Sequence, residues 1–207
     1  MTTIGRWSPN KVRNKIIDAQ WVSETRYALE LVAPSSVVTA GTGSSATISA
    51  LGSVSFTTCE NIKLVGVFSG GYDNYMVVAR HQGSQSGAPG LVCRLLSGTT
   101  EASGSNYTQQ ALVAGGTTVS GVRDTSQTSG RWSASDSNLR SGVTGYVYGP
   151  FLAQPTASRS VSIDAFDNAR VADYAWTHSL STSYDGLMLI VGSGNFSGRV
   201  AVYGMRG

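Results

Sequence analysis

Three aspartates are the residues of this sequence that come closest to a catalytic pattern. Asp164, Asp167 and Asp173 lie near one another in the chain, and most glycan-cleaving enzymes use two carboxylates placed across a glycosidic bond. Asp167 is followed by Asn168, however, and this pair is typical of a turn, so Asp164 and Asp173 would lie apart on the two flanking strands. We expect these aspartates to belong to a hairpin, and we expect that the protein is not an enzyme.

The histidines and cysteines form no metal-binding or nucleophile pattern. His81 and His178 are far apart, and Cys59 and Cys93 lack the paired, close spacing of a zinc site. The sequence also has no Gly-x-Ser-x-Gly elbow, no phosphate-binding glycine loop and no His-Glu-x-x-His motif. We therefore expect no metal and no cofactor, and we expect two reduced cysteines in the core rather than a disulfide.

Binding is better supported than catalysis, because the chain is rich in aromatic and hydroxyl side chains. Exposed Trp and Tyr rings stack on sugar faces, while Ser, Thr and Asn donate and accept hydrogen bonds. The candidates for contact with a glycan are Trp132, Tyr146, Tyr148 and Trp176. The alternative is that at least half of these rings anchor the core, where aromatic side chains dominate the packing.

Charge and hydropathy exclude several classes of partner. Only 13% of the residues are charged and the net charge is +3, which is too small for a nucleic-acid-binding domain. The sequence has no apolar run of the length that spans a membrane, and Met1-Thr2-Thr3-Ile4 does not begin the apolar core of a signal peptide. We expect neither nucleic acid nor membrane as a partner, and synthesis in a cytoplasm without export.

After residue 46 the sequence pattern is that of β-strands separated by Gly, Ser, Asn and Asp turns. Many short strands at close spacing predict an all-β fold, a jelly-roll-like antiparallel β-sandwich over residues 46–207. The predicted strands cover residues 46–51, 54–58, 62–68, 75–81, 91–96, 108–114, 117–122, 131–134, 143–148, 159–165, 169–178, 186–191 and 198–203.

The first 45 residues differ from the rest and predict an attachment arm. Residues 1–33 carry a cluster of basic side chains and at most one helix, although residues 21–22 and 27–32 could equally be extended. The Pro- and Ser-rich residues 34–45 are typical of a linker. The cluster is either a solvated face or a surface that meets an acidic partner. The arm residues that we expect to dock on a larger particle are Arg6, Trp7, Lys11, Arg13, Lys15 and Trp21.

Short phrases follow one another in a characteristic order from residue 54 to the C-terminus. They include Ser55-Phe56-Thr57-Thr58-Cys59, Tyr72-Asp73-Asn74-Tyr75, Gly149-Pro150-Phe151-Leu152 and Gly198-Arg199-Val200-Ala201. In this order they resemble the virion structural proteins of phages and prophages, of the minor tail, tail-fibre, head-fibre or capsid decoration type. The resemblance covers most of the chain and leaves out the arm. It implies a compact β-sandwich that trimerises, with its own copies and other virion proteins as partners.

The resemblance implies a location in the virion, after assembly in the host cytoplasm, and it leaves two functions open. The protein is either a capsid decoration, head-fibre or tail appendage component that docks by its arm, or a tail receptor-binding protein that recognises host surface glycan. The apolar run Tyr75-Met76-Val77-Val78-Ala79 predicts a strand covered by the second sheet on one side and by a partner subunit on the other. We expect a charge at Val77 to disrupt folding or assembly.

Overall fold

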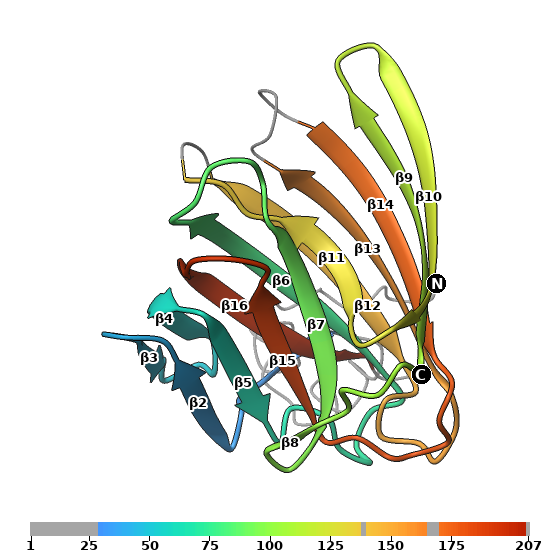
Figure 1. The fold of residues 1–207 in the computed structure, drawn as a ribbon. Coiled ribbons are helices and arrows are strands. Elements are labelled where there is room, and N and C mark those ends of the chain that lie inside the picture. The colour runs from blue at the N-terminus through green and yellow to red at the C-terminus, as the bar shows by residue number, and fades with distance from the viewer. Residues whose placement is uncertain (1–28, 138–139, 165–169, 206–207) are drawn as a thin grey trace, which may run out of the picture.

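A computed structural model describes residues 29–137, 140–164 and 170–205. These residues form sixteen β-strands and no helix, arranged as two antiparallel sheets that pack face to face (Figure 1). The predicted all-β, jelly-roll-like sandwich is therefore confirmed. Each of the thirteen predicted strands corresponds to an observed strand, and β1, β2 and β8 are additional.

The larger sheet has ten strands. From one edge to the other the order is β10 (Thr118–Gln127), β9 (Tyr107–Gly115), β14 (Arg170–His178), β13 (Thr156–Asp164), β12 (Ser141–Tyr148), β6 (Asn74–Gly83), β16 (Phe196–Met205), β4 (Val54–Cys59) and β3 (Ser45–Ile48). The tenth strand, β1 (Leu29–Val32), pairs with the second half of β16, beyond the residues that pair with β4.

The smaller sheet has six strands and covers only part of the larger one. Its order is β11 (Gly130–Ala134), β7 (Gly90–Ser97), β15 (Gly186–Val191), β5 (Asn61–Val65) and β2 (Ser36–Ala40), with β8 (Thr100–Glu101) beside β7. Its edge strand β11 packs over β13 and β14. The β9–β10 hairpin lies beyond this edge and projects from the sandwich (Figure 1).

Along the strands, side chains that point into the space between the sheets alternate with side chains that point to solvent. Tyr75, Val77 and Ala79 of β6 are buried in the core, whereas Val78 and Arg80 between and beyond them are exposed. On β7, Arg94 points outward between the buried Cys93 and Leu95. Because side chains of a strand alternate between faces, a charge at Val77 would act on folding, which is one of the two outcomes expected from the sequence, and not on a subunit interface. Val77 packs in the core, and Val78 is the outward-facing residue.

The predicted domain boundary also needs correction. Residues 34–45 are not a linker, because Ser36–Ala40 form β2 and pair with β5, and Ser45 begins β3. Leu29–Val32, which we assigned to the arm, pair with β16. The sandwich therefore begins no later than Leu29. The predicted arm helix and the docking residues Arg6 to Trp21 lie outside the described residues.

Candidate functional site

The outward-facing side of the larger sheet carries an exposed apolar surface, which we call the outer face. Register places its side chains in neighbouring rows that cross the sheet. One row runs through Val78, Thr144, Val161, Asp173 and Leu112, on β6, β12, β13, β14 and β9. The next row contains Ile163, Val171 and Val119, on β13, β14 and β10. The six apolar residues that define the outer face are Val78, Leu112, Val119, Val161, Ile163 and Val171.

On β13 the usual distribution of apolar and polar side chains between the two faces of a sheet is inverted. Ser158, Ser160 and Ser162 are buried between the sheets, while Val161 and Ile163 are 48% and 57% exposed. A half-buried strand normally turns its apolar side inward. Here the inward serines contact β11: Trp132 Nε1 donates to Ser158 Oγ at 3.0 Å, and Ser160 Oγ donates to the Trp132 carbonyl at 3.0 Å. The apolar side of β13 is therefore left without cover in the single chain.

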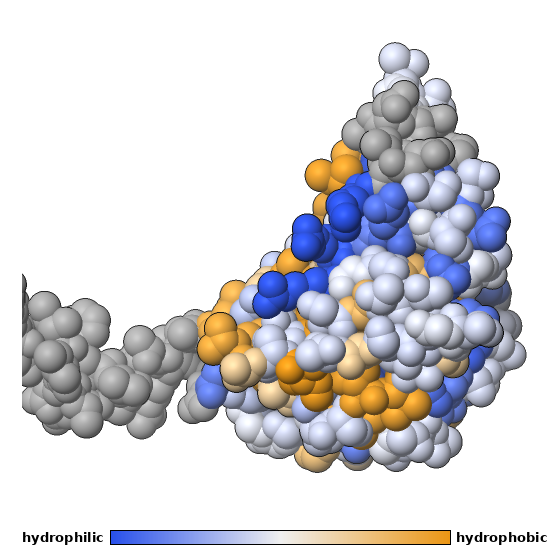
Figure 2. Space-filling model, turned by 90° about the vertical axis from the view of Figure 1, so that its left-hand side faces the viewer, coloured by the Kyte–Doolittle hydropathy of each residue, from blue (hydrophilic) through white to orange (hydrophobic). Residues whose placement is uncertain are grey.

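A shallow depression of about 580 Å³ lies on the outer face between β16 and β13. Val78, Val161 and Ile163 line it, and Arg80 and Arg199 stand directly opposite each other on β6 and β16. Like charges at opposite positions of neighbouring strands repel, and the Arg199 guanidinium donates to Ser53 Oγ through Nε and Nη2. In Figure 2, which views the domain from the side of β2 and β3, orange hydrophobic side chains stand along the left-hand profile.

Two tyrosines and an ion pair lie next to the depression. The rings of Tyr146 and Tyr148 are stacked, with centroids 6.4 Å apart and planes 13° from parallel. Arg159, opposite Tyr146 on β13, donates to both carboxylate oxygens of Asp173, at 3.1 and 2.6 Å. This partner lowers the pKa of Asp173. Tyr148 is 41% exposed and Tyr146 is half-buried, so both predicted glycan-contact tyrosines are accessible.

The two tryptophans predicted to contact glycan are not accessible. Trp132 is 0% and Trp176 is 2% exposed, and both belong to the main core cluster. Trp132 lies at a β-bulge between Arg131 and Ser133, which turns its ring inward over β12 and β13. Trp176 packs beneath Gly130 and against the ring of Tyr107. The prediction for Trp132 and Trp176 is therefore wrong, and the open alternative that such rings anchor the core is correct for them.

Of the three aspartates considered for catalysis, Asp173 is the one whose side chain the structure describes. Asp173 is held by Arg159, Asp164 pairs in register with Arg170 at the end of β13, and Asp167 lies outside the described residues. No group of three or more potential metal ligands is present within residues 29–137, 140–164 and 170–205. The described part of the chain contains no helix of the length and hydrophobicity that a membrane span requires.

Both histidines and both cysteines are buried. His81 Nδ1 lies 3.1 Å from Ser135 Oγ, and desolvation lowers the pKa of His81 to about 4. Burial also lowers the pKa of His178, which packs between Tyr107 and Tyr184. Cys59 and Cys93 are free thiols, as predicted, and burial raises the pKa of each. All four side chains pack in the core.

The sequence pattern did not identify the outer-face residues Val161 and Ile163. The available signal was the alternation Thr156-Ala157-Ser158-Arg159-Ser160-Val161-Ser162-Ile163, in which small hydroxyl side chains occupy every second position. That alternation marks two different faces but does not say which face is inward. The contact of the serines with Trp132 determines which face of β13 is inward. Trp132 belongs to β11, which precedes β13 in the chain and is separated from it by β12.

No protein-family profile and no curated protein matches this chain. Among solved structures, the SPRY domain of human HERC1 is similar over 82% of this chain and 99% of that domain, at 8% identity and a TM-score of 0.33. A structure of infectious bursal disease virus, Gt strain, is similar over 86% of this chain and 41% of that chain, at 10% identity and a TM-score of 0.17. Neither similarity is high enough to define a family or a function.

Proposed function

We propose that the protein is a phage virion structural protein, a capsid decoration, head-fibre or tail appendage component that acts by association and not by catalysis. Its outer face packs against further copies of the chain in a homotrimer, and the residues before Leu29 dock on the particle. The observation that carries this proposal is the inversion of β13, which buries serines and exposes Val161 and Ile163. The trimer and the virion location follow from the resemblance of the sequence phrases to phage structural proteins.

The energetic argument starts from the exposed side chains. Burying a valine or isoleucine side chain fully contributes about 1.5–3 kcal/mol. Val161, Ile163 and Val171 lie on the adjacent strands β13 and β14, and Val78 on β6 is separated from Val161 by Thr144 of β12. The four side chains share one face, so a single partner surface can cover them together. Contiguous apolar patches of this kind mark protein interaction sites. A second copy is the occupant that fits, because virion components assemble from many identical chains and symmetric self-association is the commonest kind.

The first experiment introduces charge at the proposed interface. The double variant Val161→Glu/Ile163→Glu is compared with Leu51→Glu, whose parent side chain is 79% exposed on the β3–β4 turn, away from the outer face. Light scattering coupled to size exclusion should show a trimer for the parent and Leu51→Glu proteins and a monomer for the double variant. A parent chain that is monomeric at all concentrations, or a double variant that remains trimeric, would refute the proposal.

The second experiment removes the arm without removing sheet strands. Because Leu29–Val32 pair with β16, the deletion should cover residues 1–28 and stop there. The shortened protein should keep its β-rich circular dichroism spectrum and its oligomeric state but should no longer join the particle. Incorporation at the parental level would exclude the arm as the docking element.

The second candidate function is glycan recognition by a tail receptor-binding protein. It is favoured by the stacked, accessible rings of Tyr146 and Tyr148 beside the polar pair Arg159 and Asp173. Copy number separates the two functions: a decoration protein is present in hundreds of copies on the head, whereas an adhesin is present as a few trimers at the tail. Immunogold labelling of intact particles measures this directly.

A further inference from the structure

A second recess lies on the opposite face of the larger sheet, where the smaller sheet ends. The inner surface of the β9–β10 hairpin is not covered by β11, and a cleft of about 200 Å³ remains between them. Gln109, Asp124 and Val122 line it from the hairpin, and Arg131, Arg170 and Tyr174 line it from β11 and β14. Two guanidinium groups, one carboxylate and one amide therefore converge on one small cleft with an aliphatic wall.

The polar groups of the cleft are held in place by the fold. The guanidinium of Arg131 lies over the ring of Tyr174, 5.5 Å from its centroid. The backbone N–H of Arg131 donates to Gln109 Oε1 at 2.9 Å, and Gln109 Nε2 donates to Asp124 Oδ2 at 2.7 Å. This chain of contacts joins β11, β9 and β10. A ligand would therefore meet groups that are already oriented, which reduces the entropy lost on binding.

The buried rings of Trp132 and Trp176 fix the position of β11, which carries Arg131 into the cleft. Gly130 lies so close to the Trp176 ring that only a residue without a side chain fits there. The next residue, Arg131, then points outward into the cleft while Trp132 turns inward. Trp132 and Trp176 thus support the cleft from beneath.

We propose that this cleft binds a carboxylated sugar, such as a uronic or sialic acid residue of a surface glycan. A guanidinium binds a carboxylate through two parallel hydrogen bonds, which makes arginine the preferred partner for this group. Asp124 and Gln109 offer acceptors and a donor for sugar hydroxyls, and Val122 supplies an apolar contact for the C–H face. The volume is below the roughly 300–1,000 Å³ of pockets for drug-sized ligands, so the cleft admits one sugar unit and not an extended chain.

This inference goes beyond the proposed assembly role and does not depend on it. The cleft and the outer face lie on opposite sides of the larger sheet. Loss of the trimer in the Val161→Glu/Ile163→Glu protein leaves the cleft residues unchanged, and absence of sugar binding leaves the trimer unaffected.

The test compares sugars that differ only in the carboxylate. Methyl glucuronoside, methyl galacturonoside and the methyl glycoside of N-acetylneuraminic acid are titrated into the full chain by NMR, beside methyl glucoside and methyl galactoside. At least one acidic sugar should bind about tenfold or more tightly than the neutral sugars, because a hydrogen bond to a charged group accounts for a difference of this size. Equal binding of acidic and neutral sugars, or no binding of any probe, would overturn the proposal.

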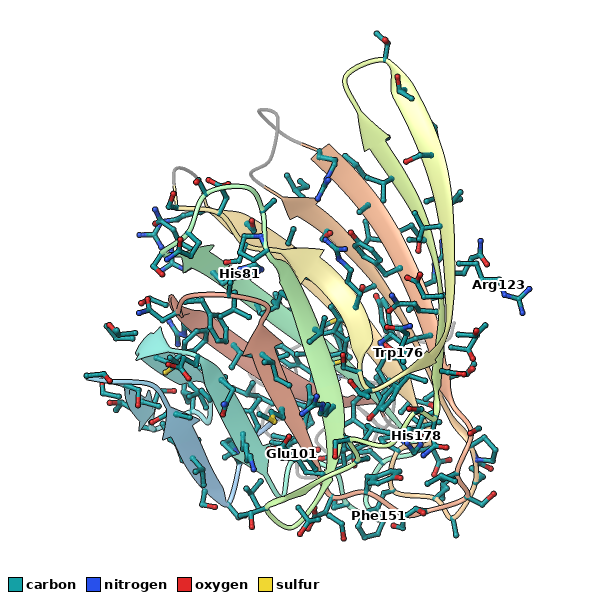
Figure 3. The ribbon with its side chains drawn as sticks, viewed as in Figure 1. His81, Glu101, Arg123, Phe151, Trp176 and His178 are labelled. Carbon is teal, nitrogen blue, oxygen red and sulfur yellow. The ribbon has the colours of Figure 1, made fainter. Side chains whose placement is uncertain are left out.

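Matched arginine variants locate the site. Arg131→Gln removes one cleft guanidinium and should weaken binding of the acidic sugar about tenfold or more. Arg123→Gln makes the same change in charge on β10, but its side chain points away from the sandwich (Figure 3) and it should bind like the parent. Thermal unfolding of each variant verifies that the fold is intact. Equal weakening by both variants would assign the effect to net charge and reject the cleft.

Discussion

Two adjacent valines on β6 provide the sharpest test of how the larger sheet is oriented. Val77 is 0% exposed between the sheets, whereas Val78 is 39% exposed on the outer face. The same substitution, Val→Glu, at these neighbouring positions should therefore have different consequences. Val77→Glu should prevent stable folding, and Val78→Glu should leave the monomer folded but weaken the assembly.

The loss in the free energy of unfolding that we expect for Val77→Glu has two contributions. Loss of a buried valine side chain costs about 1.5–3 kcal/mol. A carboxyl group buried without a partner has its pKa raised by about 3–5 units, so it folds protonated, and this proton uptake costs a further ~3–4 kcal/mol at about pH 7. The sum is comparable to the roughly 5–15 kcal/mol that stabilises a whole domain. At Val78 the side chain remains in contact with water, and the free energy of unfolding of the monomer should change by no more than about 0.5 kcal/mol.

Urea unfolding followed by circular dichroism measures both variants beside the parent. The direction in which the stability of Val77→Glu changes with pH tests whether the new carboxyl group is buried. A raised folded-state pKa destabilises the fold as the pH rises above the unfolded value of about 4.3, so the gap between Val77→Glu and the parent should shrink as the pH is lowered. If Val77→Glu is as stable as the parent at pH 7, or if Val78→Glu is the variant that unfolds, the assignment of the two faces of β6 is wrong.

Three further predictions concern the core. Gly130→Ala should lower the stability by about 1–3 kcal/mol, because the new methyl group overlaps the Trp176 ring; a lower Tm measures this, and an unchanged Tm would contradict the packing. Because burial lowers the pKa of His81 from 6.5 to about 4, the neutral ring is favoured in the fold, and stability should fall by about 3 kcal/mol as the pH drops from 6.5 to 4. The His81→Gln protein should show a smaller loss over the same range in urea titrations. Cys59 and Cys93 should react with a thiol reagent only on unfolding, so labelling at the rate of a small thiol peptide in native buffer would contradict their burial.

The sequence predicted the strands well wherever alternation or turn residues were strong. The predicted strands 108–114 and 117–122 form the β9–β10 hairpin with Gly115-Gly116 between them, and the predicted strand 91–96 forms β7. The strand β2 was missed because it is short and lies next to Pro34 and serines that resemble a linker, whereas β1 lies in a stretch that the sequence left open between helix and strand. Their stability comes from pairing with β16 and β5, and nothing in a local window reveals a partner that lies so far along the chain.

The candidate site was harder to predict than the fold. Which side of β13 faces inward depends on Trp132 of β11, and neither strand alone carries that information. Trp176 was a glycan candidate with core packing as the open alternative, because large rings serve either role, and the packing under Gly130 decides between them. Tyr146 and Tyr148, which were also glycan candidates, are accessible because both occupy outward-facing positions of β12.

The entry of the chain into the domain has a mechanical consequence. β1 joins the larger sheet through four residue pairs with β16, and β2 joins the smaller sheet through five pairs with β5. Only residues 33–35 separate these two attachments. A pulling force applied through the residues before Leu29 would therefore reach both layers almost at once. If tension separates β1 from β16, the force then acts on the pairing of β2 with β5. Two strand pairings must therefore break before the core is exposed.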